Sequence, residues 1–349
     1  MILGIESSCD ESALALFDPA SGFCGEWILS QLDLHRDYGG VVPELASREH
    51  LEAFPILLGK LFEQVGEHRG EIREIAVTCG PGLAPCLALG ISMAQALGVA
   101  WDVPVRGINH LRGHAFSVFI GLYAEDPATF LERLTLQLPH LGLLVSGGNT
   151  LLFEIREGLD IHVLAQTLDD AAGEALDKGA KLLGLDYPGG ALLEKLALDG
   201  DPTWRDFPRA FAKKADMCFS FSGLKTSLRY LLEKMDDAEV EARLADLCAS
   251  YQAAVVDQLV AKPVQALRAG DYRSLGLSGG VANNRNLRAR FTALARKQSV
   301  PLLMSEPGHS GDNASMIAFA SFAEEQPGTA YDAQAHIPLL PSLRITESP

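Results

Sequence analysis

Two polar turns, each flanked by apolar segments, restrict the possible folds of this chain more than any other feature. The first lies at residues 7–11 within a largely apolar stretch at 2–17, and the second lies at residues 146–149 within a stretch at 141–155. Each pattern predicts two strands joined by a short turn. Because the two hairpins lie roughly 140 residues apart, they indicate a duplicated domain with a phosphate-holding hairpin in each half. A tight hairpin in which glycine supplies a positive φ is the alternative for each turn.

The rest of the chain alternates strands and helices, which predicts an α/β fold. Its 349 residues exceed the length of about 250 to 300 residues at which single cores stop growing, so we expect two domains, at residues 1–138 and 139–349. A duplicated α/β domain of this kind is the plan of the actin-like and sugar-kinase-like (ribonuclease H-like) ATPases, in which a nucleotide lies in a cleft between related domains. The predicted helices cover residues 44–65, 84–98, 167–184 and 238–268, the last with a break near Pro263.

His110 and His114 are four residues apart, which in a helix places both imidazoles on one face. A helix offers two nitrogens to one metal ion in this way, and a catalytic ion needs a third protein ligand. Asp312, in a glycine-rich segment, is the best candidate, although a helix N-cap is the simpler explanation of that residue alone. Leu111 disfavours a zinc protease, whose motif has glutamate beside the first histidine. The alternative is that the two histidines lie one turn apart by chance and bind no metal.

Four further segments have features of ligand contacts. The helix at 167–184, capped by Thr167 or Asp169, carries a row of carboxylates that could hold ribose hydroxyls, and a solvated face is the alternative. Glycines at 189–190 and 279–280 let the backbone approach a ligand closely. The turn at 80–82 precedes a helix whose free N–H groups could bind an anion, and packing of helix on strand is the alternative. The carboxylates are those of Asp170, Glu174 and Asp177.

The formal net charge of −16 repels nucleic acid on average, so an RNA substrate would need a local basic patch or a partner. Basic and aromatic residues interleave at 199–229, as an RNA contact surface requires, and a loop with a hydrophobic anchor is the alternative. A second basic stripe follows at 285–297. The aromatic residues are Trp204, Phe207, Phe211, Phe219 and Phe221, and the basic ones are Arg205, Arg209, Lys213, Lys214, Lys225, Arg229, Arg285, Arg288, Arg290, Arg296 and Lys297.

Membrane and export signals are not expected in this sequence. No uninterrupted apolar run approaches the length of a membrane span, and the amino terminus lacks the basic region of a signal peptide. We therefore expect a cytoplasmic protein that has no membrane partner.

Several segments, in order along nearly the whole chain, resemble the bacterial tRNA N6-adenosine threonylcarbamoyltransferase family, which was once mislabelled as a sialoglycoprotease. They lie at residues 4–12, 37–48, 169–178, 219–226 and 312–313. The resemblance implies an actin-like ATPase fold and transfer of a threonylcarbamoyl group from threonylcarbamoyl-adenylate to the N6 amine of the adenosine beside the anticodon, with release of AMP. It also implies small partner proteins, which include a degenerate paralogue and an ATPase.

The resemblance also implies roles for individual residues. Family metal ligands, for iron(II) or sometimes zinc, match His110, His114 and Asp312. Residues that match Asp10 and Glu11 lie near the reacting phosphate end and are candidates for proton transfer. Family substrate-binding positions match Leu144, Val145, Ser146, Gly147, Gly148, Asp177, Gly190 and Asn284.

Three segments depart from the usual family pattern. The commonly Ser-Gly-Gly-His-Thr turn has Asn149, the commonly His-His-x-Glu-Gly-His helix has Asn109 and Arg112, and the commonly Thr-Asp-Asn-Gly loop reads Gly-Asp-Asn-Ala at 311–314. None removes a metal ligand. The rival functions are an ATPase or small-molecule kinase of the same fold, a carbamoyltransferase for small molecules, and a nucleotide-sensing scaffold with a structural metal.

Overall fold

The computed structural model of the chain describes residues 1–211, 216–324 and 336–349. These residues form two compact units, Met1–Leu136 with Ser305–Pro349, and Gln137–Met304. The predicted division placed residues 305–349 in the second domain, whereas the structure packs the described part of this range, residues 305–324 and 336–349, in the first unit. Asp312 therefore belongs to the same unit as His110 and His114.

The first unit contains a five-stranded sheet in the order β3-β2-β1-β4-β5. β2 is antiparallel to both β1 and β3, and β1, β4 and β5 are parallel to one another. The strands are β1 (Ile2–Glu6), β2 (Glu11–Asp18), β3 (Gly22–Ser30), β4 (Glu74–Gly80) and β5 (Val105–Asn109). The helices are α1 (Leu32–Arg36), α2 (Pro43–Val65), η1 (Gly66–Glu71), α3 (Ala84–Trp101), α4 (His110–Ser117), α5 (Ile120–Glu125), η2 (Pro127–Thr129), α6 (Phe130–Leu136), α12 (Pro307–Ser310) and α13 (Ala314–Ala323).

The second unit contains a six-stranded sheet in the order β11-β10-β6-β7-β8-β9. Its strands are β6 (His140–Val145), β7 (Thr150–Ile155), β8 (Ile161–Thr167), β9 (Cys218–Phe219), β10 (Ser274–Ser278) and β11 (Leu302–Met304). Its helices are α7 (Ala172–Leu182), α8 (Gly189–Ala197), α9 (Ser222–Leu232), α10 (Asp237–Ala269), η3 (Gly280–Asn283) and α11 (Arg285–Gln298).

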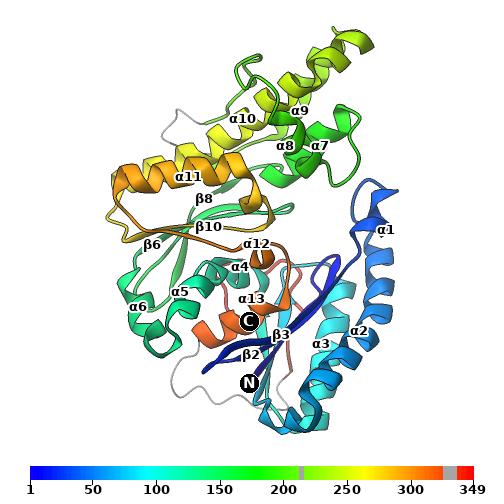
Figure 1. Ribbon diagram of the computed structural model, residues 1–349, viewed down its shortest axis with the longest axis vertical. Helices are drawn as coiled ribbons and strands as arrows, with labels where there is room; N and C mark the ends of the chain where they lie inside the picture. Colours follow the sequence, from blue (N-terminus) through cyan, green and yellow to red (C-terminus); the bar gives the residue numbers. More distant parts are fainter. Residues whose placement is uncertain (212–215, 325–335) are drawn as a thin grey trace. The chain divides into compact units, whose positions relative to one another are not determined.

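The two sheets repeat one plan. β8-β7-β6-β10-β11 has the same order and the same strand directions as β3-β2-β1-β4-β5, with an antiparallel meander followed by two parallel strands. The predicted hairpins are confirmed as β1–β2 and β6–β7, of which β2 and β6 are labelled in Figure 1. The predicted duplicated α/β fold is likewise confirmed.

The return of the chain to the first unit is explained by α13. Every residue of this helix except Phe322 is buried, and a helix that is apolar all round must be covered on all sides. α13 packs against β1, β2 and α4. It approaches β1 so closely that a Cβ on Gly4 would lie 2.3 Å from the Ala314 carbonyl oxygen. Only glycine allows this contact, which fixes the segment that carries Asp312.

Two helix predictions need correction. α3 is long and apolar enough to cross a membrane by length and composition, contrary to the expectation from sequence. In the fold, however, α3 packs on β4 and α2, with Leu87 and Ile91 in the core. The predicted break near Pro263 is wrong, because α10 continues through that residue, held on both sides by the buried Leu259 and Ala266.

Candidate metal and substrate site

The helix α4 presents two imidazoles from its first two turns. It begins directly after β5, where the Asn109 side-chain oxygen accepts hydrogen bonds from the N–H groups of Leu111 and Arg112. This cap satisfies helix donors that would otherwise lack partners. The His110 and His114 rings lie 4.8 Å apart between centroids, nearly perpendicular to each other. The predicted helix with both histidines on one face is confirmed.

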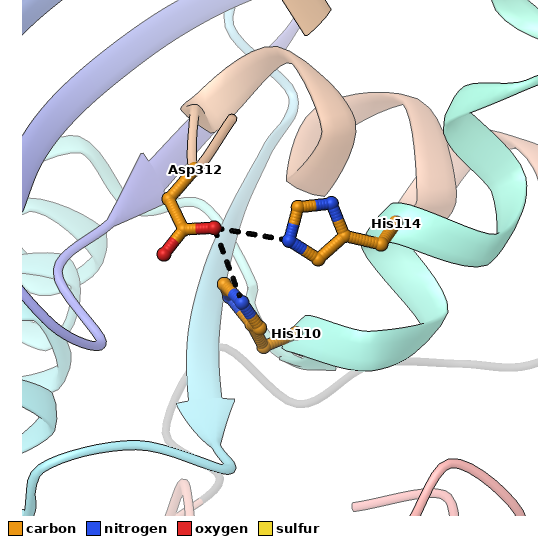
Figure 2. Close-up of side chains that lie close together, drawn as sticks. All are labelled: His110, His114 and Asp312. Carbon is orange, nitrogen blue, oxygen red and sulfur yellow. Dashed lines mark hydrogen bonds and ion pairs between the residues drawn. The ribbon is translucent and has the colours of Figure 1, made fainter. Parts of the chain in front are cut away.

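Asp312 faces these imidazoles from the segment before α13. Its Oδ1 lies 3.0 Å from His114 Nε2 and 3.5 Å from His110 Nε2 (Figure 2). Asp312 is not the cap of the next helix, since Asn313 caps α13 by accepting from the Met316 N–H. The Asp312 carboxylate is thus available to the histidines, and the ligand atoms of the three residues lie within 4.8 Å of one another.

The chemistry of this cluster fits a divalent metal ion. Two imidazole nitrogens and one carboxylate form the donor set of non-haem iron(II) sites and of catalytic zinc sites. The buried His114 Nδ1 has no hydrogen-bond partner among the residues that the structure describes. Burial raises the pKa of the Asp312 carboxyl, but the neighbouring His110 and His114 outweigh this effect and hold it well below its usual value. A carboxylate that stays ionised is what a cation requires.

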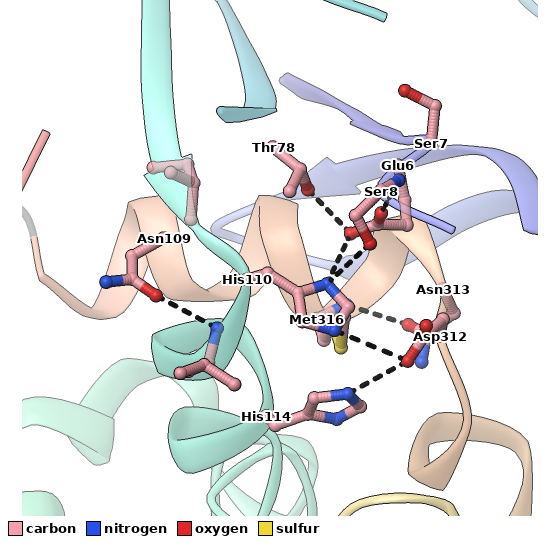
Figure 3. A network of polar contacts seen from close by, with 12 residues as sticks. Glu6, Ser7, Ser8, Thr78, Asn109, His110, His114, Asp312, Asn313 and Met316 are labelled. Atoms are coloured by element: carbon pink, nitrogen blue, oxygen red, sulfur yellow. Dashed lines mark hydrogen bonds and ion pairs between the residues drawn. The ribbon is translucent and has the colours of Figure 1, made fainter. Parts of the chain in front are cut away.

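Glu6 is a component of this site that sequence reasoning missed. Its side chain is fully buried at the end of β1. The Glu6 Oε2 atom accepts from the Thr78 hydroxyl at 2.6 Å and lies 3.0 Å from His110 Nδ1, while Oε1 accepts from the Ser8 N–H at 2.5 Å (Figure 3). A carboxylate at Nδ1 fixes the tautomer and orientation of a ligating histidine and leaves Nε2 for the metal. The signal for Glu6 in the sequence was a charged residue within an apolar segment predicted to be a strand.

Asp10 lies in the turn between β1 and β2, and Glu11 is the first residue of β2. The Glu11 carboxyl accepts a hydrogen bond from the Ser30 hydroxyl at 3.0 Å. Burial, followed by the charges of Asp10 and Asp312, raises the pKa of Glu11 to about 9. Glu11 is therefore protonated at neutral pH, when no cation offsets the charge of Asp312. Both acidic residues lie in the same unit as the histidines.

In the second unit, the turn after β6 leaves open space beside two glycines. The Ser146 N–H donates to the Asn149 carbonyl at 2.8 Å and closes the hairpin. Neither Gly147 nor Gly148 has a positive φ, and a Cβ on either would meet no described atom within 4 Å. The alternative that these glycines serve a strained turn is therefore not supported. Leu144 and Val145 are fully buried in β6 and can offer a ligand only backbone groups.

The helix α7 begins beside this turn and differs from its prediction. It starts at Ala172, with Ala171 at the N-cap position and no side-chain cap. A Cβ on Gly173 would lie 2.5 Å from the Ser146 carbonyl oxygen, so glycine is needed for the contact of helix and turn. Asp169 instead accepts hydrogen bonds from residues at the start of α9, and Thr167 donates to the Asp170 carbonyl.

The predicted row of carboxylates divides into two groups. Lys178 pairs with Asp170 at 2.7 Å and with Glu174 at 2.9 Å. Asp177 instead accepts from the Gly190 N–H at 2.8 Å. The structure thus brings together Asp177 and Gly190, two residues predicted to bind substrate. Burial raises the pKa of the Asp177 carboxyl, and its backbone hydrogen bonds oppose this effect.

Asn284 lies at the start of α11, and both ends of its amide make contacts within the protein. Its Oδ1 caps the helix by accepting from the Leu287 N–H at 3.0 Å, and its Nδ2 donates to Gln252 Oε1 at 2.7 Å. The substrate roles of Asn284, Asp177, Gly190 and the Ser146 turn stay predictions.

The aromatic part of the predicted RNA surface is wrong for three residues. Phe207, Phe219 and Phe221 are buried in the core of the second unit, so they cannot stack on bases. Two of the predicted basic residues, Arg209 and Arg290, form ion pairs with the same carboxylate, that of Asp257. The predicted Lys213 and Lys214 lie outside the residues that the structure describes. The three buried aromatic side chains instead fit the alternative interpretation of this segment, a loop with a hydrophobic anchor.

Known proteins resemble the chain in sequence over nearly its whole length. A family model described as tRNA N6-adenosine threonylcarbamoyltransferase matches residues 22–319. A protein of that name from Anaeromyxobacter dehalogenans (strain 2CP-1 / ATCC BAA-258) is 45% identical over 320 residues, which cover 91% of this chain and 92% of the relative.

Two solved structures resemble the chain in fold. The component A of (R)-2-hydroxyglutaryl-CoA dehydratase from Acidaminococcus fermentans has a TM-score of 0.51 at 13% identity, covering 93% of this chain and 99% of that chain. HypF from T. kodakarensis has a TM-score of 0.58 at 14% identity, covering 93% of this chain and 47% of that chain. These likenesses concern the fold alone, and they confirm the predicted duplicated actin-like architecture.

Proposed function

The chain belongs to the tRNA N6-adenosine threonylcarbamoyltransferase family, and we propose that it transfers the threonylcarbamoyl group of threonylcarbamoyl-adenylate to the N6 amine of the adenosine beside the anticodon. The tRNAs concerned read codons that begin with A, and AMP is the second product. The observation that carries this proposal is the convergence of His110, His114 and Asp312 in one unit, beside the turn with Asp10 and Glu11.

The three ligand residues would hold one divalent ion, iron(II) in preference to zinc. When bound, such an ion supplies Lewis-acid polarisation of the carbamoyl carbonyl. His110 presents Nε2 because Glu6 occupies its Nδ1 side. Asp312 supplies the negative charge, and the buried faces of α4 keep both imidazoles in place.

Asp10 and Glu11 are the proposed proton-transfer groups. The exocyclic amine is a weak nucleophile that must lose a proton as the new bond to the carbamoyl carbon forms. Burial, the largest cause of the raised pKa of Glu11, and the neighbouring Asp10 carboxylate act whether or not an ion is bound, so we assign Glu11 as the group that donates a proton to the departing phosphate. Asp10, its hydrogen-bond partner, is then the better candidate to take the amine proton.

The adenylate would contact the second unit. The open space beside Gly147 and Gly148 suits a group that approaches the backbone closely. The backbone of Leu144, Val145 and Ser146 adjoins that space, and Asp177 with Gly190 suits a ribose. Asn284 would contribute at the start of α11.

Partner proteins are proposed for the first unit. The helix α2 exposes three large apolar side chains, Leu51, Ile56 and Phe62, which are 59%, 54% and 45% exposed. Contiguous exposed apolar surface typifies protein interfaces. A degenerate paralogue is the proposed partner there, and an ATPase is the second. We place the protein in the cytoplasm, where its tRNA substrate is.

Product analysis tests the proposal. The purified protein, with its partners, is given tRNA and threonylcarbamoyl-adenylate, and we expect modified adenosine in the tRNA with one AMP per transfer. ADP or phosphate from ATP with unmodified tRNA would instead indicate a kinase or ATPase of the same fold. Carbamoylation of a small molecule, or binding of the adenylate without turnover, would contradict transfer to tRNA.

A further inference from the structure

The carboxyl-terminal residues 336–349, which we call the strap, lie against the first unit beside the metal-bearing helix. Leu340 N–H donates to the Cys79 carbonyl at 2.8 Å, and the Pro341 carbonyl accepts from the Gly82 N–H at 3.2 Å. Ile337 and Leu343 are buried in the core of this unit. The strap is thus tied to the fold by both backbone and side chains.

The strap occupies the turn at 80–82, for which the sequence left open both anion binding and packing of helix on strand. A Cβ on Gly80 would lie 1.9 Å from the Leu340 carbonyl oxygen, and Gly80 has a φ of +155°. Gly82 N–H is used by the strap, and the next N–H, that of Leu83, donates to the Ser8 carbonyl at 2.8 Å. These donors at the start of α3 are therefore occupied by the chain itself.

Asn109 connects the strap to the first turn of α4. Its Oδ1 caps α4, while its Nδ2 donates to the carbonyls of Arg344 and Glu347 at 2.7 and 3.0 Å. One buried amide thus holds the helix on one side and the strap on the other (Figure 3 shows the cap). The next residue is His110, so a displacement of this amide would move a metal ligand.

Arg112 makes a second connection. Its Nη1 donates to the Ile345 carbonyl at 3.3 Å, and its Nε donates to Glu324 Oε1 at 2.5 Å, just beyond α13. Arg112 is 8% exposed, so loss of these partners would leave a buried charge poorly satisfied. Asn109 and Arg112 are also the two α4 positions that depart from the family pattern, and both departures are explained by contacts to the strap.

We propose that residues 336–349 form a strap that fixes the start of α4, with Asn109 and Arg112 as the positioning residues that join the two. Release of the strap loosens α4 and moves His110 and His114 away from Asp312. Binding of a metal ion and docking of the strap are therefore coupled, and each strengthens the other. The consequence for metal binding rests on the proposed function, whereas the coupling of strap and helix does not.

The variant Asn109→Asp tests this inference in the full chain. Aspartate can still accept from the N–H groups of Leu111 and Arg112, so the helix cap is kept, but it cannot donate to the strap carbonyls. Leu343→Ala loosens the strap from its opposite side, in the core. Ser342→Ala, at an exposed strap position, is the matched control.

Hydrogen exchange of backbone amides and Zn²⁺ affinity are the readouts. For both Asn109→Asp and Leu343→Ala, we expect faster amide exchange in the strap (336–349) and in α4 (110–117). We also expect Zn²⁺ affinity to fall about tenfold, which is the low end of the loss seen when residues that orient metal ligands are changed. Ser342→Ala should match the unaltered protein. Faster exchange in the strap with unchanged exchange in α4 would overturn the inference. Failure of the unaltered protein to bind Zn²⁺ or Fe²⁺ would contradict the proposed metal site. The exchange data would still test whether the strap is coupled to α4.

Discussion

At the residue scale, Glu6 orients His110, one of the three predicted metal ligands. It is fully buried and accepts hydrogen bonds from Ser8 and Thr78 as well as lying against His110. Burial lowers the pKa of His110, but the charge of Asp312, followed by the charge and hydrogen bond of Glu6, raises it to about 9. In the metal-bound protein the same carboxylate would hold the Nδ1 proton of a neutral imidazole.

Glu6→Gln should therefore weaken metal binding while it preserves volume. The amide carries no charge and can present a donor to Nδ1, so the preferred tautomer of His110 is lost. We expect metal affinity to fall by about 10- to 100-fold, measured by competition with a chelator. Glu154→Gln, at a buried carboxylate of the second unit, is the control. An affinity unchanged by Glu6→Gln would show that Glu6 serves the fold alone.

At the scale of elements, the two hairpins differ in what their turns do. The turn between β1 and β2 carries carboxylates, and the turn between β6 and β7 carries glycines with free space beside them. Gly173 and Gly279 close this second turn from two sides, since a Cβ on either would lie within 2.5 Å of the backbone of Ser146 or Val145. Backbone contacts therefore hold the second turn on the sides of Gly173 and Gly279, while the space beside Gly147 and Gly148 is open.

Gly147→Ala tests whether that open space receives the adenylate. Because the added methyl meets no described atom within 4 Å, we expect the melting temperature to stay unchanged. A ligand that approaches the backbone would be displaced, so the KM for threonylcarbamoyl-adenylate should rise about tenfold, equivalent to about 1.4 kcal/mol of lost binding. Gly173→Ala, by contrast, should lower the melting temperature. Unchanged KM in Gly147→Ala would place the adenylate elsewhere.

At the scale of the whole molecule, sequence patterns identified what is local and missed what joins distant segments. The hairpins and the helix with His110 and His114 could be predicted because alternation and helical spacing are local signals. The strap could not, because residues 336–349 follow no period and the groups that tie them to the rest of the unit, in Cys79, Gly82 and Asn109, are more than 200 residues away in sequence. The return of residues 305–324 and 336–349 to the first unit was missed for the same reason.

Acid stability is a further property of the whole molecule that depends on one buried histidine. Burial lowers the pKa of His140 to about 3, and its Nδ1 contacts Ser274 Oγ at 2.7 Å. The unfolded chain binds a proton at this residue below its ordinary pKa of about 6.5, while the folded chain does so only near 3. The stability present above pH 6.5 is therefore lost as the pH falls towards 3.

His140→Gln should reduce this pH dependence. In metal-free protein, the slope of the unfolding free energy against pH between 4 and 6 should become less steep than in the unaltered protein by about 1.4 kcal/mol per pH unit, the value for one proton. Denaturant unfolding at a series of pH values gives both slopes. Parallel curves for the two proteins would mean that His140 titrates alike in the folded and unfolded states.

The central claim is that threonylcarbamoyl transfer takes place at a metal ion held by His110, His114 and Asp312. Its most direct test measures metal content by elemental analysis and modified adenosine in tRNA for the unaltered protein and for His110→Ala/His114→Ala, with a circular dichroism spectrum to confirm folding. We predict about one equivalent of metal and modified tRNA for the unaltered protein, and neither for the folded double variant. Full modification of tRNA by the metal-free double variant would contradict the claim.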